Sequence, residues 1–211
     1  MFKCVLFDLD GTLIQTTDII IDAFKMTFKH FFPDLVLSDD EWTNMLGHTL
    51  YTTFGYYASS KEDVDKMVSF YRTYSNDLIE TSLKAYPKAE ETLKYLKKKN
   101  IKIGVVTSKM SHVAKHHLEM TGLLNYIDGL IGYEDVIEHK PSPEPIEKAI
   151  ALLSAHKKTT IYIGDHENDI ISAKKAGIES CAVTYSQRLQ AMLNEQPTYV
   201  IDELENIKDL I

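Results

Sequence analysis

The 211-residue sequence is poor in arginine and in long apolar runs. It has only two arginines, Arg72 and Arg188, and its net charge is −8. We therefore expect no nucleic-acid partner, because binding a phosphate backbone needs a positive face. No apolar run approaches the roughly 18 residues of a membrane helix, so we expect no membrane partner. The sequence begins with a strand pattern and not with a signal peptide, which predicts a cytoplasmic protein.

Cysteine is also scarce. Cys4 and Cys181 both lie in apolar runs, which is typical of small buried side chains in a reducing compartment. A disulfide between them stays an open alternative at the level of sequence. The length suits one domain or a domain with an insert, and nothing in the composition points to an obligate protein partner.

Two carboxylates follow a short apolar run near the start of the chain. Residues 5–7 are too few for a helix and predict a buried strand, which leads into Asp8, Asp10 and Gly11. Residues two apart in an extended chain point to the same side, so both carboxylates can face one small volume. Like charges this close need a cation, and Mg²⁺ binds through one or two carboxylates plus phosphate oxygens. The pattern Asp-x-Asp-Gly alone also suits an ordinary polar turn.

The periodicity of the chain changes near residue 85. Over residues 18–81 the apolar residues recur at helical spacing, with capping side chains at Thr16-Thr17-Asp18, Ser38 and Ser60, and no strand is predicted. Further on, helical segments alternate with apolar strands, which predicts βαβ units and a parallel sheet. The expected strands cover residues 5–7, 101–106, 127–131, 160–163, 180–183 and 198–201.

These patterns predict a two-part α/β protein. Residues 1–15 and 85–211 are expected to form a catalytic core, a Rossmann-like three-layer sandwich around the parallel sheet. Residues 16–84 are expected to form an all-helical domain inserted after the first strand. Because the insert joins the core only at its two ends, it is suited to act as a hinged lid.

Three later segments carry side chains suited to phosphate chemistry. Each has an ordinary alternative: a capped helix start, a solvated lysine, or acidic residues at a helix N-terminus. The carboxyl ends of parallel strands meet at one edge of a sheet, so the segments can converge on Asp8. They contain Thr107, Ser108 and Lys109; Lys140; and Asp165 with Asp169.

The string Phe-Asp-Leu-Asp-Gly-Thr-Leu at residues 7–13 and the three later segments resemble, in this order, the four motifs of the haloacid dehalogenase (HAD) superfamily. The helical insert resembles the type 1 cap of that family, so the resemblance spans essentially the whole chain. It implies that Asp8 is a nucleophile that becomes phosphorylated. It also implies that Asp10 is the general acid and base, and that Lys140 bridges nucleophile and phosphate.

The same resemblance implies the remaining site residues. Thr107 and Ser108 are expected to bind the phosphoryl group. Mg²⁺ is expected to be held by a carboxylate oxygen of Asp8, the backbone carbonyl of Asp10 and the side chain of Asp165. Asp169 is expected to support this site.

The motifs resemble most the group of phosphoglycolate phosphatases, PpaX-type pyrophosphatases and β-phosphoglucomutases. The resemblance implies a Mg²⁺-dependent phosphohydrolase whose partner is a small phosphorylated metabolite such as phosphoglycolate or pyrophosphate. Mutases of this group carry an acidic residue before the metal-binding Asp, where this chain has Gly164. This glycine weighs against a phosphosugar mutase, which is kept as the first alternative. A non-catalytic phosphate-binding regulatory protein is the second alternative.

Substrate choice is expected to come from the helical insert. Candidate contacts there are also common surface residues, and the aromatic run beside them is expected to be core rather than a stacking platform. Three histidines near residue 115 lack a further ligand and are expected on a helix surface. The candidate contacts are His48 and Arg72, and the aromatic run is Tyr51, Phe54, Tyr56 and Tyr57. The three histidines are His112, His116 and His117.

Overall fold

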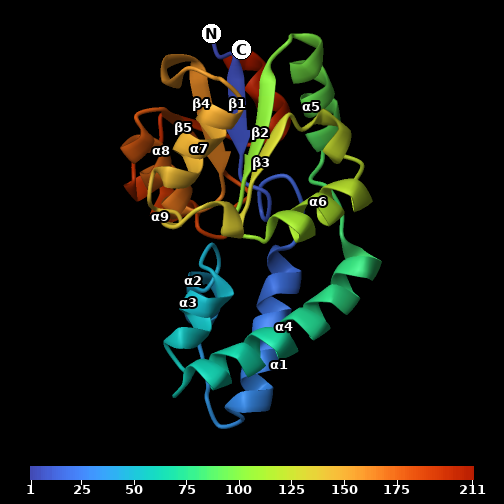
Figure 1. Cartoon of the computed structure of the whole chain (residues 1–211), viewed down its shortest axis with the longest axis vertical. Coiled ribbons are helices and arrows are strands. Elements are labelled where there is room, and N and C mark those ends of the chain that lie inside the picture. The colour runs from blue at the N-terminus through green and yellow to red at the C-terminus, as the bar shows by residue number, and fades with distance from the viewer. The chain divides into compact units, whose positions relative to one another are not determined.

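A parallel six-stranded sheet in the order β3-β2-β1-β4-β5-β6 organises the computed structural model, which describes residues 1–211 (Figure 1). The first strand lies between β2 and β4, with Cys4 opposite Lys102 on one side and Thr160 on the other. The predicted parallel α/β sheet is confirmed. Its strands are β1 (Cys4–Phe7), β2 (Lys102–Val106), β3 (Gly129–Ile131), β4 (Thr160–Gly164), β5 (Glu179–Val183) and β6 (Tyr199–Ile201).

The chain divides into two compact units, Met1–Gln15 with Lys84–Ile211, and Thr16–Leu83. In the first unit Cys4 and Leu6 of β1 pack with residues of α7 and α8 in one apolar cluster, and both helices lie in front of the strands in Figure 1. The helices of this unit are α5 (Ala89–Lys98), α6 (Ser111–Met120), α7 (Glu144–Leu152), α8 (Glu167–Ala176) and α9 (Leu189–Asn194). Short 3₁₀ helices are η1 (Leu124–Tyr126), η2 (Tyr133–Asp135), η3 (Lys157–Thr159) and η4 (Leu204–Leu210).

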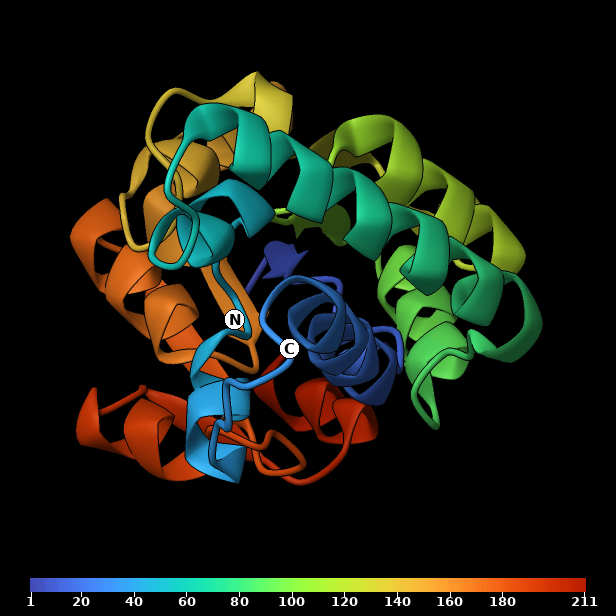
Figure 2. The ribbon, with the colours of Figure 1, turned by 90° about the horizontal axis from the view of Figure 1, so that it is seen from below.

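The second unit is helical throughout. Its helices are α1 (Thr17–Phe31), α2 (Asp39–Asn44), α3 (Leu50–Gly55) and α4 (Lys61–Ser82). The two long ones, α1 and α4, are seen in Figures 1 and 2 and share an apolar cluster that includes Phe24, Phe28 and Tyr71. Aromatic rings pack edge-on in this cluster, for example Phe24 on Phe54 at 5.6 Å between centroids. This unit therefore has a core of its own.

Local differences from the predictions have simple causes. Ser38 and Ser60 cap α2 and α4 through their side chains as predicted, but Thr16 makes no side-chain cap for α1, so that prediction is wrong. Thr16 is already in helical backbone geometry, whereas a capping residue is extended. Helix α3 was not predicted, although Thr49 caps it. Cys4 and Cys181 are both buried and free, so no disulfide joins them.

None of the helices combines the length and the apolar character that crossing a membrane would require.

Candidate active site

Asp8 is the first residue after β1, and it is buried at the carboxyl end of the sheet. Its backbone N–H donates to the carbonyl of Ile163 at 2.8 Å, which extends the pairing of β1 with β4 by one residue. Gly11 follows with a positive φ of 77°, where a Cβ atom would lie 2.1 Å from Asp165 Oδ2. Only glycine lets the turn after β1 come this close to the Asp165 carboxylate.

Lys140 joins the strand ends through its ammonium group. Its Nζ donates to Asp8 Oδ1 at 2.8 Å, to Asp169 Oδ1 at 2.7 Å and to the hydroxyl of Tyr162 at 3.0 Å. These contacts use all three protons of the ammonium. Burial alone lowers the pKa of Lys140, but the charges of Asp169 and Asp8 raise it well above its usual value. The side chain is therefore a permanent buried cation.

The position of Lys140 in the chain differs from the prediction. The sequence analysis expected each of the four site segments to follow the carboxyl end of a strand. Asp8, Thr107 and Asp165 each follow a strand directly. Lys140 instead lies in the loop between η2 and α7, well beyond the end of β3. Its long side chain covers the remaining distance to the edge of the sheet.

Tyr162 is a site residue that the sequence analysis missed. It lies within β4 and is fully buried. Its hydroxyl donates to the carbonyl of Val106 at 2.9 Å and accepts from Lys140, with Asp169 Oδ1 at 3.2 Å. The available signal was a tyrosine inside a continuous apolar strand, because a buried hydroxyl needs a hydrogen-bond partner.

Asp169 lies in the first turn of α8 and is only 1% exposed. Its Oδ1 accepts from Lys140 and its Oδ2 accepts from the backbone N–H of His166 at 3.0 Å. A Cβ atom on Gly164 would lie 2.3 Å from Asp169 Oδ2. Any side chain at position 164 would therefore displace this carboxylate from Lys140.

The carboxylates of Asp8, Asp165 and Asp169 form one cluster. One oxygen of each lies within 4.8 Å of the other two. Burial, followed by the charges of Asp169 and Asp10, raises the pKa of Asp8 to about 7 although Lys140 lowers it. Burial and the charges of Asp8 and Asp169 also raise the pKa of Asp165 well above its usual value. Two buried carboxylates and a half-buried one, gathered this closely, are a site that a hard divalent cation fits.

The three carboxylates differ in how many of their oxygens already accept hydrogen bonds from the protein. Both oxygens of Asp169 accept hydrogen bonds from the protein, as just described. Asp165 Oδ1 accepts from the hydroxyl of Thr12 at 3.1 Å, and the hydroxyl of Ser186 donates to the Asp165 carbonyl. Asp8 and Asp165 are therefore the carboxylates best able to hold a cation, and Asp169 is better suited to holding Lys140.

Asp10 and the end of β2 form the second part of the site. Thr107 is buried directly after β2, and Ser108 beside it is half-buried. The hydroxyl of Thr107 accepts from the backbone N–H of Lys109 at 3.2 Å, and Lys109 Nζ donates to Asp10 Oδ1 at 2.7 Å. The structure thus joins Asp8 to Lys140 and Asp169, and joins Asp10 to Lys109.

The histidines of α6 are not all on the surface. His112 and His116 are exposed, as predicted, but His117 is 2% exposed, so the prediction for this residue is wrong. His117 Nδ1 lies 3.1 Å from Lys109 Nζ. The available signal was its place beside Leu118 and three residues after Ala114, on the apolar face of the helix.

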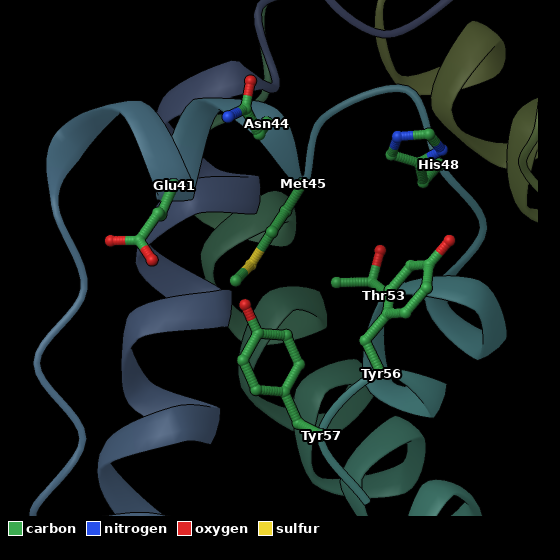
Figure 3. Close-up of a pocket in the computed structure, with 7 residues that line it drawn as sticks. All are labelled: Glu41, Asn44, Met45, His48, Thr53, Tyr56 and Tyr57. Atoms are coloured by element: carbon green, nitrogen blue, oxygen red, sulfur yellow. The ribbon is translucent and has the colours of Figure 1, made fainter.

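The helical unit has a pocket of its own, with a volume of about 260 Å³. Figure 3 shows its lining side chains, which come from α2, the loop after it, α3 and the two residues that follow α3. The candidates His48 and Arg72 are both exposed, and only His48 lines the pocket. Of the predicted core aromatics, Phe54 is fully buried and Tyr57 packs against the core, but Tyr51 and Tyr56 are exposed. The lining residues are Glu41, Asn44, Met45, His48, Thr53, Tyr56 and Tyr57.

Comparisons of the chain with a family model and with known proteins agree on one family. The family model described as haloacid dehalogenase-like hydrolase matches residues 5–183. The chain is 35% identical over 210 residues to pyrophosphatase PpaX of Oceanobacillus iheyensis, covering 99% of this chain and 95% of that one. It is 34% identical over 208 residues to pyrophosphatase PpaX of Halalkalibacterium halodurans, with 98% and 95% coverage.

The fold agrees with these sequence matches. A haloacid dehalogenase-like protein from Bacteroides fragilis superposes with a TM-score of 0.89 at 26% identity, covering 98% of this chain and all of that one. The chain belongs to the haloacid dehalogenase-like hydrolase family, and the predicted family membership is confirmed. It is an enzyme of the hydrolase class.

Proposed function

We propose that this chain is a Mg²⁺-dependent phosphohydrolase of small phosphorylated metabolites, with inorganic pyrophosphate as the first candidate substrate and phosphoglycolate as the second. The observation that carries the proposal is the hydrogen bond from Lys140 to Asp8 Oδ1 inside the cluster of carboxylates formed by Asp8, Asp165 and Asp169. It orients a carboxylate at the edge of the sheet and leaves Asp8 Oδ2 as the oxygen that attacks phosphorus. The choice of pyrophosphate rests on the names of the PpaX relatives.

The reaction has two displacements at phosphorus. Asp8 attacks, the bond from phosphorus to the leaving oxygen breaks, and Asp10 gives that oxygen a proton. Asp10 then takes a proton from a water molecule that attacks the aspartyl-phosphate, which releases inorganic phosphate and restores Asp8. Thr107 and Ser108 bind the phosphoryl oxygens through both steps, and the positive charge of Lys140 beside Asp8 stabilises the negative charge that develops there.

The bound Mg²⁺ would neutralise charge on Asp8 and on the transferring phosphoryl group. Asp8, Asp165 and the backbone carbonyl of Asp10 would hold it. The raised pKa of Asp8, about 7, supports this assignment, because without a cation a large share of the nucleophile would be protonated near neutral pH. We further propose that the helical unit, residues 16–84, is a cap that selects the substrate.

The proposal is tested first by the Asp8→Asn variant. We expect wild-type protein to release phosphate only with Mg²⁺, and Asp8→Asn to lose at least about 10⁴-fold in kcat, since the nucleophile is gone. The measurement is phosphate release from pyrophosphate, phosphoglycolate, nucleoside monophosphates and sugar phosphates. Asp209→Asn is the control, because Asp209 is exposed in η4.

Each alternative function has its own outcome in this assay. A folded, Mg²⁺-binding wild type that releases no phosphate from any compound would contradict the hydrolase proposal and favour a phosphate-binding protein. A phosphoryl group that moves from one position of a sugar phosphate to another, without release of phosphate, would indicate a mutase. The hydrolase is preferred over the mutase because position 164, where mutases of the group carry an acidic residue, is glycine in this chain.

A second prediction concerns Tyr162→Phe, which removes one hydroxyl from the site. Lys140 loses an acceptor and the Val106 carbonyl loses its donor, so we expect kcat to fall about 10-fold and the free energy of unfolding to fall by about 1–2 kcal/mol. Steady-state kinetics and thermal denaturation measure both. Tyr199→Phe in β6 is the matched control, and equal effects of the two variants would refute a role for the Tyr162 hydroxyl.

A further inference from the structure

Lys109 links the proposed proton donor Asp10 to a buried histidine. Its Nζ lies 2.7 Å from Asp10 Oδ1 and 3.1 Å from His117 Nδ1. The Lys109 and Asp10 side chains are 16% and 19% exposed, so their ion pair is partly shielded from water. Neither Lys109 nor His117 belongs to the set of catalytic residues proposed above.

The chemistry of the contact fixes the state of His117. An ammonium group only donates hydrogen bonds, so His117 Nδ1 is the acceptor and the ring proton lies on Nε2. His117 is therefore neutral in this arrangement. A protonated His117 would place a donor, and a second positive charge, against Lys109.

The backbone of Lys109 is fixed as firmly as its side chain. Its N–H donates to the Thr107 hydroxyl, and its carbonyl accepts from the backbone N–H of Tyr133 at 2.8 Å. A Cβ atom on Gly132 would lie 2.8 Å from that carbonyl, so the segment from β3 packs directly on it. The backbone of Lys109 is therefore held by Thr107 and Tyr133, and its ammonium group by Asp10 and His117.

We propose that Lys109, held in place by His117, is a positioning residue that fixes the carboxylate of Asp10 for proton transfer. The inference rests on the proposed role of Asp10. A carboxyl group transfers its proton through one oxygen, so a bond that fixes Oδ1 also fixes where Oδ2 lies. Misplacing a reacting group by about 1 Å can slow a reaction about 10²-fold, which sets the size of the expected effect.

The test is a double-mutant cycle with pyrophosphate as substrate. Lys109→Met is expected to lower kcat about 100-fold and to change KM less than about 3-fold. In an Asp10→Asn background, the same substitution is expected to change kcat less than about 2-fold, because Lys109 acts only through Asp10. Lys109→Arg is expected to restore most of the wild-type kcat, and Lys115→Met, on the exposed face of α6, is the control.

His117 is tested by two substitutions in the same assay. His117→Leu removes the acceptor and is expected to lower kcat about 10-fold, while His117→Gln keeps an acceptor oxygen and is expected to retain more activity. Thermal denaturation of each variant shows whether it is folded. If His117→Leu does not fold, the comparison of Lys109→Met with Lys109→Arg decides the proposal alone.

Two results would overturn this role. A Lys109→Met variant with wild-type kcat would show that Asp10 needs no such support. An equally large loss in the Asp10→Asn background, or a large rise in KM, would show that Lys109 contacts the substrate itself. Failure of the proposed function would give a different result: wild-type protein would release no phosphate, or would release it without Asp8. In that case the proposed role of Lys109 would also be refuted.

Discussion

Lys140→Met is expected to lower kcat/KM about 10³-fold and the free energy of unfolding by about 3–5 kcal/mol. The catalytic loss follows from the proposed role of Lys140, because the variant removes the cation beside the proposed nucleophile Asp8. The loss of stability follows because the variant leaves Asp8 and Asp169 buried without the ammonium between them. The side chain of Lys140 is 6% exposed, so water replaces little of the lost interaction. Activity assays and chemical denaturation at neutral pH measure the two effects.

The matched control for this prediction is Lys157→Met. Lys157 is about half exposed and pairs with Glu147 at 2.8 Å, so its loss is expected to change stability by less than about 1 kcal/mol and activity not at all. Similar stability losses in the two variants would show that the carboxylate cluster does not depend on Lys140. An active Lys140→Met protein would remove Lys140 from the mechanism.

The fold was largely predictable because its signal is local. Each expected strand is an apolar run between polar turns, and each is present in the sheet. The helices that escaped prediction, α3 and α9, are six residues long, and in α3 threonine, tyrosine and glycine weaken the helical pattern. The predicted cap of α1 at Thr16 failed because capping depends on backbone geometry, which composition does not fix.

In the candidate site, too, the residues with a local sequence signal were predictable and those that depend on distant contacts were not. Asp8, Asp165 and Asp169 lie in short motifs next to strands, so spacing alone brought them to attention. Contacts that hold the site span long stretches of sequence, for example 99 residues from Lys109 to Asp10 and 132 from Lys140 to Asp8. Whether a lysine or histidine is solvated or buried depends on such contacts, which is why the surface prediction for His117 was wrong.

The second large effect that we expect is on the stability of the metal-free protein, and it comes from removing the charge of the half-buried Asp165. Asp165→Asn is expected to raise the Tm of metal-free protein at pH 8 by about 5 °C, or roughly 2 kcal/mol for a chain of this length. Burial and the nearby charges of Asp8 and Asp169 make an ionised Asp165 unfavourable when no cation is present. The amide keeps an acceptor for the Thr12 hydroxyl and adds no bulk.

The sign of the pH dependence follows from the raised pKa values. A carboxyl whose pKa is raised by folding stabilises the folded state at low pH, and this contribution is lost as pH rises through the folded pKa. For Asp8 that interval runs from its ordinary value of 3.8 to about 7. Metal-free wild type is therefore expected to lose stability from about pH 4 to pH 7 and above. Asp165→Asn is expected to lose less, because it removes one of the carboxylates that repel each other.

Mg²⁺ is expected to reverse this pattern in the wild type. At 100 times its dissociation constant, a cation that binds only the folded state adds about 2.7 kcal/mol, so Mg²⁺ raises the wild-type Tm at pH 8 by several degrees and at pH 5 by less. Asp165→Asn lacks one of the proposed ligands and is expected to show little response, whereas Asp209→Asn is expected to respond like the wild type. Differential scanning calorimetry with and without Mg²⁺ measures all of these values. A metal-free Asp165→Asn protein less stable than wild type at pH 8 would contradict the argument, because the three carboxylates would then hold the fold together without a cation.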